Sequence, residues 1–126
     1  MKFMIQAGAL LGTLAVGLGA FGAHALRASL EASGRADTFE TAVKYQFYHA
    51  LALVLVGILS QRAGEDASRW LGWSGYAFAA GVLIFSGALY AICFTGITKF
   101  GAVAPIGGLL LMAGWVLLFL AAAKLA

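Results

Sequence analysis

Residues 70–98, WLGWSGYAFAAGVLIFSGALYAICFTGIT, contain no Asp, Glu, Lys or Arg. A helix crosses the hydrocarbon core of a bilayer with roughly 20 apolar residues, so this stretch is long enough to span a membrane. Three further stretches without charge surround it, at residues 3–26, 45–61 and 100–123. Because the four stretches fill most of the 126 residues, the sequence predicts an all-α membrane protein, a four-transmembrane-helix bundle.

The composition supports this prediction. Hydrophobic residues make up 63% and charged residues 10% of the chain, against about 45–50% and about 25% in soluble domains. Backbone groups in lipid must bond internally, which favours helices. Runs such as Leu53-Val54-Leu55-Val56 lack the alternation of a membrane β-barrel strand. We therefore expect a single transmembrane domain over residues 1–126, embedded in the lipid bilayer, without the functions that need an aqueous domain.

The charges say little about orientation or partners. The net charge is +3, and the basic residues are scattered singly along the chain. This pattern predicts no nucleic-acid partner. An even number of spans returns both termini to one side, but Lys and Arg are equally divided between the two sides. Lys2 beside the amino terminus tilts the prediction towards cytoplasmic termini. Ala23-His24-Ala25 has the form of a signal-peptide cleavage site, but the apolar run before it is long enough to remain as a span.

The connection between the first two spans is the longest, and it predicts a short interfacial helix. Arg27 and Glu31 are spaced to pair along a helix, and Ser33-Gly34 has the form of a helix end. Asp37 and Glu40 resemble a capping signature, so the second long helix is expected to begin near Thr38. Glu40 is also spaced to pair with Lys44.

Small residues are predicted to hold the spans together, because they let helices approach closely where lipid removes the hydrophobic drive. Glycine-rich faces are predicted on the first, third and fourth spans. The predicted packing residues are Gly8, Gly12, Gly19, Gly22, Gly107 and Gly114. Such faces also favour assembly, so we expect a homo-oligomer or a membrane protein partner.

Uncommon polar residues gather in one half of the predicted membrane. They end the first span, begin the second and occupy the last half of the third. Polar side chains inside a membrane usually face the bundle interior or a wet cavity, and they mark candidate functional positions. The candidates for ligand binding or proton linkage are His24, Tyr45, Gln46, His49, Ser86 and Tyr90.

Two interpretations of the histidines stay open. His49 shares a helix face with Gln46, and it either makes an interhelical hydrogen bond, to Tyr90, Ser86 or a carbonyl, or takes part in proton or ligand binding. His24 either caps the first helix or joins His49 in ligating haem or a metal. No carboxylate lies inside the membrane to complete a catalytic relay. We therefore assign no catalytic residue, metal site or cofactor, and expect the protein not to be an enzyme.

Four strings together resemble a known family. They are Gly19–His24 (GAFGAH), Tyr45–Leu53 (YQFYHALAL), Phe85–Tyr90 (FSGALY) and Pro105–Gly108 (PIGG) with Gly114-Trp115. In this order they resemble the YgdD-like family of small four-span membrane proteins, filed under domain of unknown function 423. The resemblance covers nearly the whole chain and supports the four-helix topology. The short loops suggest a member of the family from the bacterial inner membrane. The resemblance implies no particular reaction. In the family a glycine often follows the first histidine, whereas this chain has Ala25 at that position.

Three functional hypotheses follow. The leading one is a non-enzymatic accessory or ligand-binding bundle with a polar pocket near His49. The second is a small transporter or channel whose path is lined by Gln46, His49, Ser86 and Tyr90, although the apolar other half of the bundle disfavours a continuous wet pore. The third is haem or metal binding through His24 and His49.

Overall fold

The computed structural model describes residues 1–125, and within them all regular secondary structure is helical. The elements are α1 (Lys2–Ala23), α2 (Arg27–Ser33), α3 (Ala36–Ser60), α4 (Glu65–Thr95), the 3₁₀ helix η1 (Thr98–Ala102) and α5 (Ala104–Ala122). Four segments are long and apolar enough to cross a membrane: α1, α3, α4, and η1 together with α5. The predicted all-α membrane fold with four spans is therefore confirmed.

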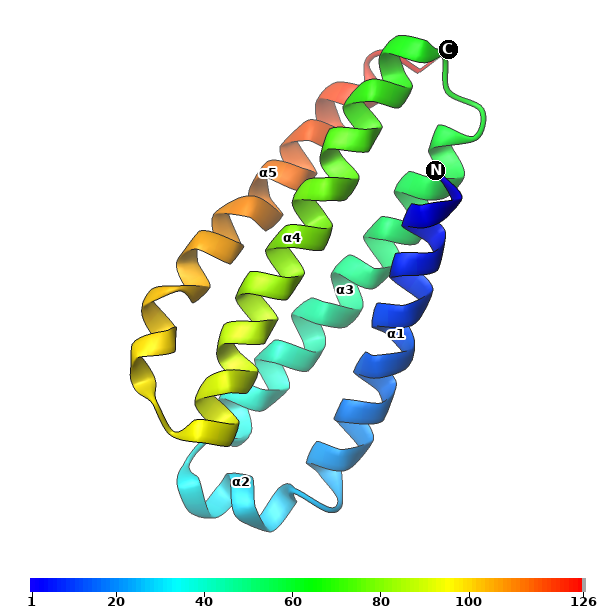
Figure 1. Ribbon diagram of the computed structural model, residues 1–126. Coiled ribbons are helices and arrows are strands. Elements are labelled where there is room, and N and C mark those ends of the chain that lie inside the picture. The colour runs from blue at the N-terminus through cyan, green and yellow to red at the C-terminus, as the bar shows by residue number, and fades with distance from the viewer. Residues whose placement is uncertain (126) are drawn as a thin grey trace.

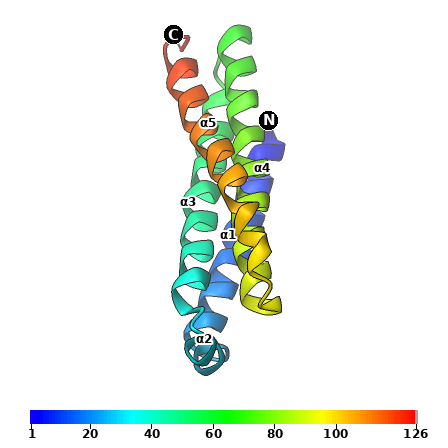
Figure 2. The ribbon, with the colours of Figure 1, turned by 90° about the vertical axis from the view of Figure 1, so that its left-hand side faces the viewer.

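The four long helices run up and down in chain order and form an open row (Figure 1). α1 packs against α3, α3 against α4, and α4 against α5. The row is much narrower when it is turned by 90° (Figure 2). Along the direction of the helix axes, the start of α1 and the end of α5 lie at one end of the bundle, and α2 lies at the opposite end (Figure 1). We call this second end the α2 end.

The predicted short helix is present as α2. It stops at Gly34, whose φ of 70° lies in the left-handed region that glycine enters without a Cβ penalty. Arg27 pairs with Glu31 at 3.1 Å, and Glu40 pairs with Lys44 at 2.9 Å, as their spacing predicts.

Two predicted helix boundaries are wrong. α3 begins at Ala36 rather than near Thr38, and no side chain caps its start. The chain turns at Gly34 and resumes a helix after a single further residue, so Asp37 already lies in the first turn, where a carboxylate favours the helix dipole. α1 ends at Ala23, short of the predicted Leu26. Pro105 stands in the first turn of α5, where its missing N–H costs no hydrogen bond.

Glycines set the closest helix approaches. A Cβ placed on Gly8 would stand 2.6 Å from the carbonyl oxygen of Ala50 in α3, and one on Gly114 would stand 2.5 Å from the Phe78 ring in α4. A Cβ on Gly107 would collide with the backbone of Phe85. Gly12 differs, because its nearest neighbour would be 3.9 Å away. In the pairs α1–α3 and α4–α5, the helices therefore touch where one of them has no side chain.

Candidate functional site

The candidate polar and charged side chains gather in two regions. The first, which we call the polar hub, lies in the middle of the row and centres on Gln46 and His49 of α3. These two side chains are only 4% and 5% exposed. The second is a cavity at the α2 end.

Gln46 joins three helices through one amide group. Its Nε2 donates to the carbonyl oxygen of Leu11 in α1 at 2.8 Å. Its Oε1 accepts from the hydroxyl of Tyr90 in α4 at 2.6 Å. A carbonyl oxygen can only accept, so these partners fix which end of the amide faces α1.

His49 joins α5 to α3. Its Nδ1 lies 2.7 Å from the carbonyl oxygen of Tyr45, and its Nε2 lies 3.0 Å from the indole Nε1 of Trp115. The carbonyl only accepts and the indole N–H only donates, so a neutral imidazole with its hydrogen on Nδ1 satisfies both partners. A second hydrogen on Nε2 would point at the indole N–H. The ring is therefore held as a neutral link between two helices.

Two serines complete the polar contacts between neighbouring helices. Ser86 in α4 donates to the carbonyl oxygen of Ala42 in α3 at 2.8 Å, and Ser74 in α4 donates to that of Gly114 in α5 at 2.7 Å. Within residues 1–125, every buried side-chain nitrogen and oxygen has a hydrogen-bond partner. The hub thus uses its polar atoms to join helices.

The structure brings together four of the six sequence-predicted candidates: Gln46, His49, Ser86 and Tyr90. Tyr45 contributes its backbone carbonyl, while its ring is 41% exposed and packs on Phe85 with the ring centroids 4.9 Å apart.

His24 lies apart from the hub. It is exposed at the C-terminal end of α1, near the level of Phe39, whereas His49 lies near the level of Gly12. This separation is about 12 residues, or about 18 Å along the helices. Among the described residues, no group of three or more His, Cys, Asp or Glu side chains is placed to hold a metal ion. The two histidines are therefore not placed for joint ligation of haem or a metal.

Sequence reasoning missed Trp115 as the partner of His49. A tryptophan at a membrane interface serves as an anchor, but Trp115 stands in the middle of the last span. A partly buried indole N–H needs an acceptor, and this requirement is the signal that would have linked Trp115 to a polar group on a neighbouring helix.

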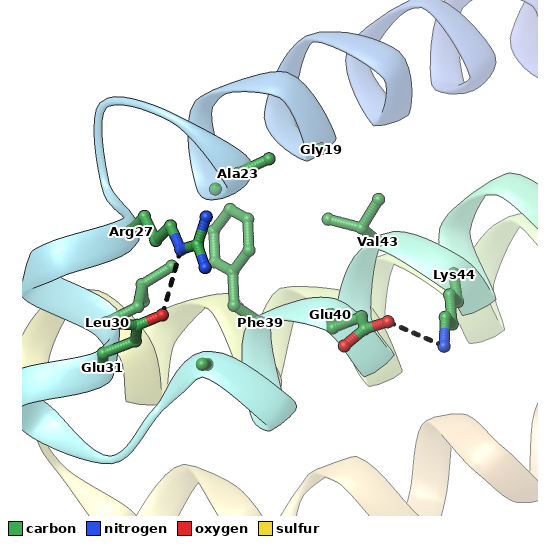
Figure 3. A pocket seen from close by; sticks show the side chains of 11 residues that line it. Gly19, Ala23, Arg27, Leu30, Glu31, Phe39, Glu40, Val43 and Lys44 are labelled. Carbon is green, nitrogen blue, oxygen red and sulfur yellow. Dashed lines mark hydrogen bonds and ion pairs between the residues drawn. The ribbon is translucent and has the colours of Figure 1, made fainter.

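The cavity is lined by the last turns of α1, by α2 and by the first half of α3 (Figure 3). Its volume is about 480 Å³. Its lining residues are Gly19, Gly22, Ala23, Arg27, Leu30, Glu31, Ala36, Phe39, Glu40, Val43 and Lys44. Seven of them are apolar and four are charged, with two charges of each sign.

The four charges form two separate ion pairs at the rim of the cavity. Arg27 Nε contacts Glu31 Oε1 at 3.1 Å, and Lys44 Nζ contacts Glu40 Oε1 at 2.9 Å. All four side chains are more than half exposed. Exposed ion pairs contribute only about 0–1 kcal/mol, so a ligand can rearrange them at little cost.

Gly19 and Gly22 leave the α1 side of the cavity without side chains. A Cβ on Gly22 would stand 2.5 Å from Cε1 of Phe39, and a Cβ on Gly19 would stand 3.4 Å from Cγ1 of Val43. The Phe39 ring therefore packs directly against α1 at Gly22, and it is only 3% exposed.

Comparison with known proteins identifies relatives along the whole chain. A family model described as "Protein of unknown function (DUF423)" matches residues 18–108. A UPF0382 membrane protein of Staphylococcus haemolyticus is 41% identical over 124 residues, 98% of each chain. A UPF0382 membrane protein of Staphylococcus aureus is 40% identical over 126 residues, which cover all of this chain and 99% of the relative. The UPF0382 membrane protein YwdK of Bacillus subtilis is 38% identical over 125 residues, 98% of each chain. No solved structure matches significantly.

Proposed function

The chain belongs to the DUF423 family of membrane proteins, and from that premise we propose that it is a non-enzymatic ligand-binding bundle of the cell membrane. The proposed ligand site is the cavity at the α2 end. The single observation that carries this proposal is a cavity of about 480 Å³ with an apolar floor and a charged rim. Sites for small molecules typically measure about 300–1,000 Å³ and combine apolar walls with a few polar groups.

This proposal moves the ligand site away from His49. The side chains of Gln46, His49 and Tyr90 use their hydrogen bonds to join α3 to α1, α4 and α5. None of their buried polar atoms is left without a partner for a ligand to bind. Hydrogen bonds between membrane helices average about 0.6 kcal/mol, enough for several of them to fix the order of the row. The polar hub then keeps α1 and α3 in the positions that form the cavity.

The ligand is expected to be amphiphilic. The cavity lies beside α1, which is an edge helix of the row (Figure 1), so we expect its ligand to enter from the surrounding lipid. Its charged residues come from the segment 27–44, which separates the first two apolar spans. A molecule with a polar head and an apolar body matches both features.

Native mass spectrometry of the protein released from membranes in mild detergent tests the proposal. We expect the wild-type chain to retain a small molecule, and Ala23→Phe to reduce its retention because Ala23 lines the cavity. Ala20→Phe is the matched control, since Ala20 is an exposed residue of the same helix outside the cavity lining. Equal retention by both variants, or none by the wild type, would refute the assignment.

The same spectrum reports the assembly. We propose a homo-oligomer in the bacterial inner membrane with both termini in the cytoplasm. A monomeric mass would contradict the homo-oligomer. A periplasmic signal from a reporter fused after α5 would contradict the orientation.

The transporter alternative has less support. A path through the hub would need Gln46, His49, Ser86 and Tyr90 to face an open space, whereas each of them is hydrogen-bonded to a neighbouring side chain or to the backbone. Flux into liposomes that is lost in His49→Ala would restore this alternative.

A further inference from the structure

We propose that the cavity at the α2 end binds the zwitterionic head of a phospholipid, with its phosphate on Arg27 and its ammonium group between Glu31 and Glu40. This inference rests on the proposed function, since it names the ligand class of the same cavity. It goes further by assigning each charged group a partner.

Arg27 supplies the phosphate contact. It extends from α2 towards the side of the cavity where Phe39 stands (Figure 3). Among the described residues only its Nε takes part in a hydrogen bond, to Glu31, so both terminal nitrogens have no protein partner. A guanidinium group with two parallel N–H donors matches the oxygens of a phosphate better than an ammonium group does.

The balance of charge at the rim selects a zwitterion. Arg27 and Lys44 are offset by Glu31 and Glu40, so the rim has no net charge. An anionic head that contacted Arg27 would also face the two carboxylates, whereas a head with a phosphate and an ammonium group offers each side a partner of opposite sign. Lys44 can then turn from Glu40 towards the water, because the pair is exposed and weak.

The dimensions match a head and the first part of its chains. The α3 part of the lining runs from Ala36 to Lys44, a length of about 12 Å along a helix. Leu30, Phe39 and Val43 supply the apolar floor below the charges. The Phe39 ring packs against α1 at Gly22. The acyl chains would leave the cavity along the surface of α1 and α3, where apolar residues face lipid.

The test uses the full chain in mild detergent, equilibrated with an equimolar mixture of phosphatidylethanolamine and phosphatidylglycerol with identical acyl chains, and read by native mass spectrometry. We expect the wild type to retain phosphatidylethanolamine in preference. We expect Arg27→Gln to reduce this retention about tenfold, the change for one lost charge-assisted hydrogen bond. Lys99→Gln is the matched control, because it removes one positive charge at the same end from an exposed residue outside the cavity.

A second variant tests the ammonium contact. Glu40→Gln leaves Arg27 in place and makes the rim net positive, so we expect the preference to shift towards phosphatidylglycerol. Both variants change exposed side chains, and an unchanged melting temperature would show that they fold.

The outcomes separate this inference from the proposed function. If phosphatidylglycerol is retained equally well in the wild type, or if Arg27→Gln binds as the wild type does, the headgroup assignment is wrong. Ala23→Phe would still reduce retention in that case, and the cavity would remain the ligand site. If neither lipid is retained and Ala23→Phe changes nothing, both ideas fail. Displacement of the lipid by inorganic phosphate alone would identify a phosphate-ion site and overturn the lipid assignment.

Discussion

The indole N–H of Trp115 in α5 donates to Nε2 of His49 in α3 across 3.0 Å, joining two helices that are not neighbours in the row. The other ring nitrogen of His49 faces the carbonyl oxygen of Tyr45 at 2.7 Å. The imidazole therefore accepts a hydrogen bond from α5 and donates one to the backbone of α3. Gln46, one helical turn away, accepts a hydrogen bond from α4 and donates one to α1.

Trp115→Phe should destabilise the protein while leaving its packing almost intact. The variant keeps an aromatic ring beside Phe78 but leaves Nε2 of His49 without a donor. Losing one hydrogen bond in a membrane protein costs about 0.6 kcal/mol on average and up to about 1.7 kcal/mol. Unfolding in mixed micelles with increasing denaturing detergent would measure it. Trp73→Phe is the control, since Trp73 is 48% exposed, and an equal loss there would show a general effect of removing tryptophan.

A double-mutant cycle should show that His49 and Trp115 act as a pair. His49→Leu and Trp115→Phe each break the 3.0 Å hydrogen bond, so the combined variant should be more stable than the sum of the two losses predicts. The expected coupling is about 0.6 kcal/mol. Additivity within about 0.3 kcal/mol, measured in the same unfolding assay, would mean that the contact contributes nothing.

Tyr90→Phe should weaken the contact of α4 with α3. It removes the hydroxyl that donates to Oε1 of Gln46 at 2.6 Å and keeps the ring against Phe39. We expect a loss of about 0.6–1.7 kcal/mol in the free energy of unfolding. Tyr76→Phe serves as the matched control on the same helix, because Tyr76 is 60% exposed. Equal stability of the two variants would contradict the role given to Tyr90.

The sequence predicted the spans because charge and hydropathy alone determine which segments enter lipid. It also predicted α2, since Gly34 carries a recognisable helix end. It did not predict where α3 begins, because Asp37 fits a capping position and a first-turn position equally well. Nor did it predict that the helices form an open row. Which helix faces meet depends on close contacts such as that of Gly107 with Phe85, and the sequence does not show which residue each glycine will contact.

The candidate site was predicted in part. Polar residues within apolar spans are rare, so Gln46, His49, Ser86 and Tyr90 were identified from sequence. Their partners are mostly backbone carbonyls, which a sequence does not distinguish from one another. The cavity could not be predicted, because its lining comes from α1, α2 and α3, and the sequence does not show how these three helices are placed relative to one another.

Gly8→Ala should destabilise the pair α1 and α3, and Gly12→Ala should not. A Cβ on Gly8 would stand 2.6 Å from the carbonyl oxygen of Ala50 and 2.8 Å from Cγ2 of Val54, and the backbone oxygen can move only if the helix moves. Forcing extra atoms into a packed contact typically costs about 1–3 kcal/mol.

At Gly12 the nearest atom would be 3.9 Å away, an ordinary contact. An alanine there should therefore be neutral or slightly stabilising through its helix propensity. Thermal unfolding of both variants in detergent would compare them, with Gly17→Ala as the control because nothing lies within 4 Å of its Cβ position. If Gly8→Ala and Gly12→Ala had the same melting temperature, the close contact of Gly8 with Ala50 would not determine the distance between α1 and α3. The opposite result, a loss confined to Gly8, would assign that spacing to one residue of the predicted glycine face.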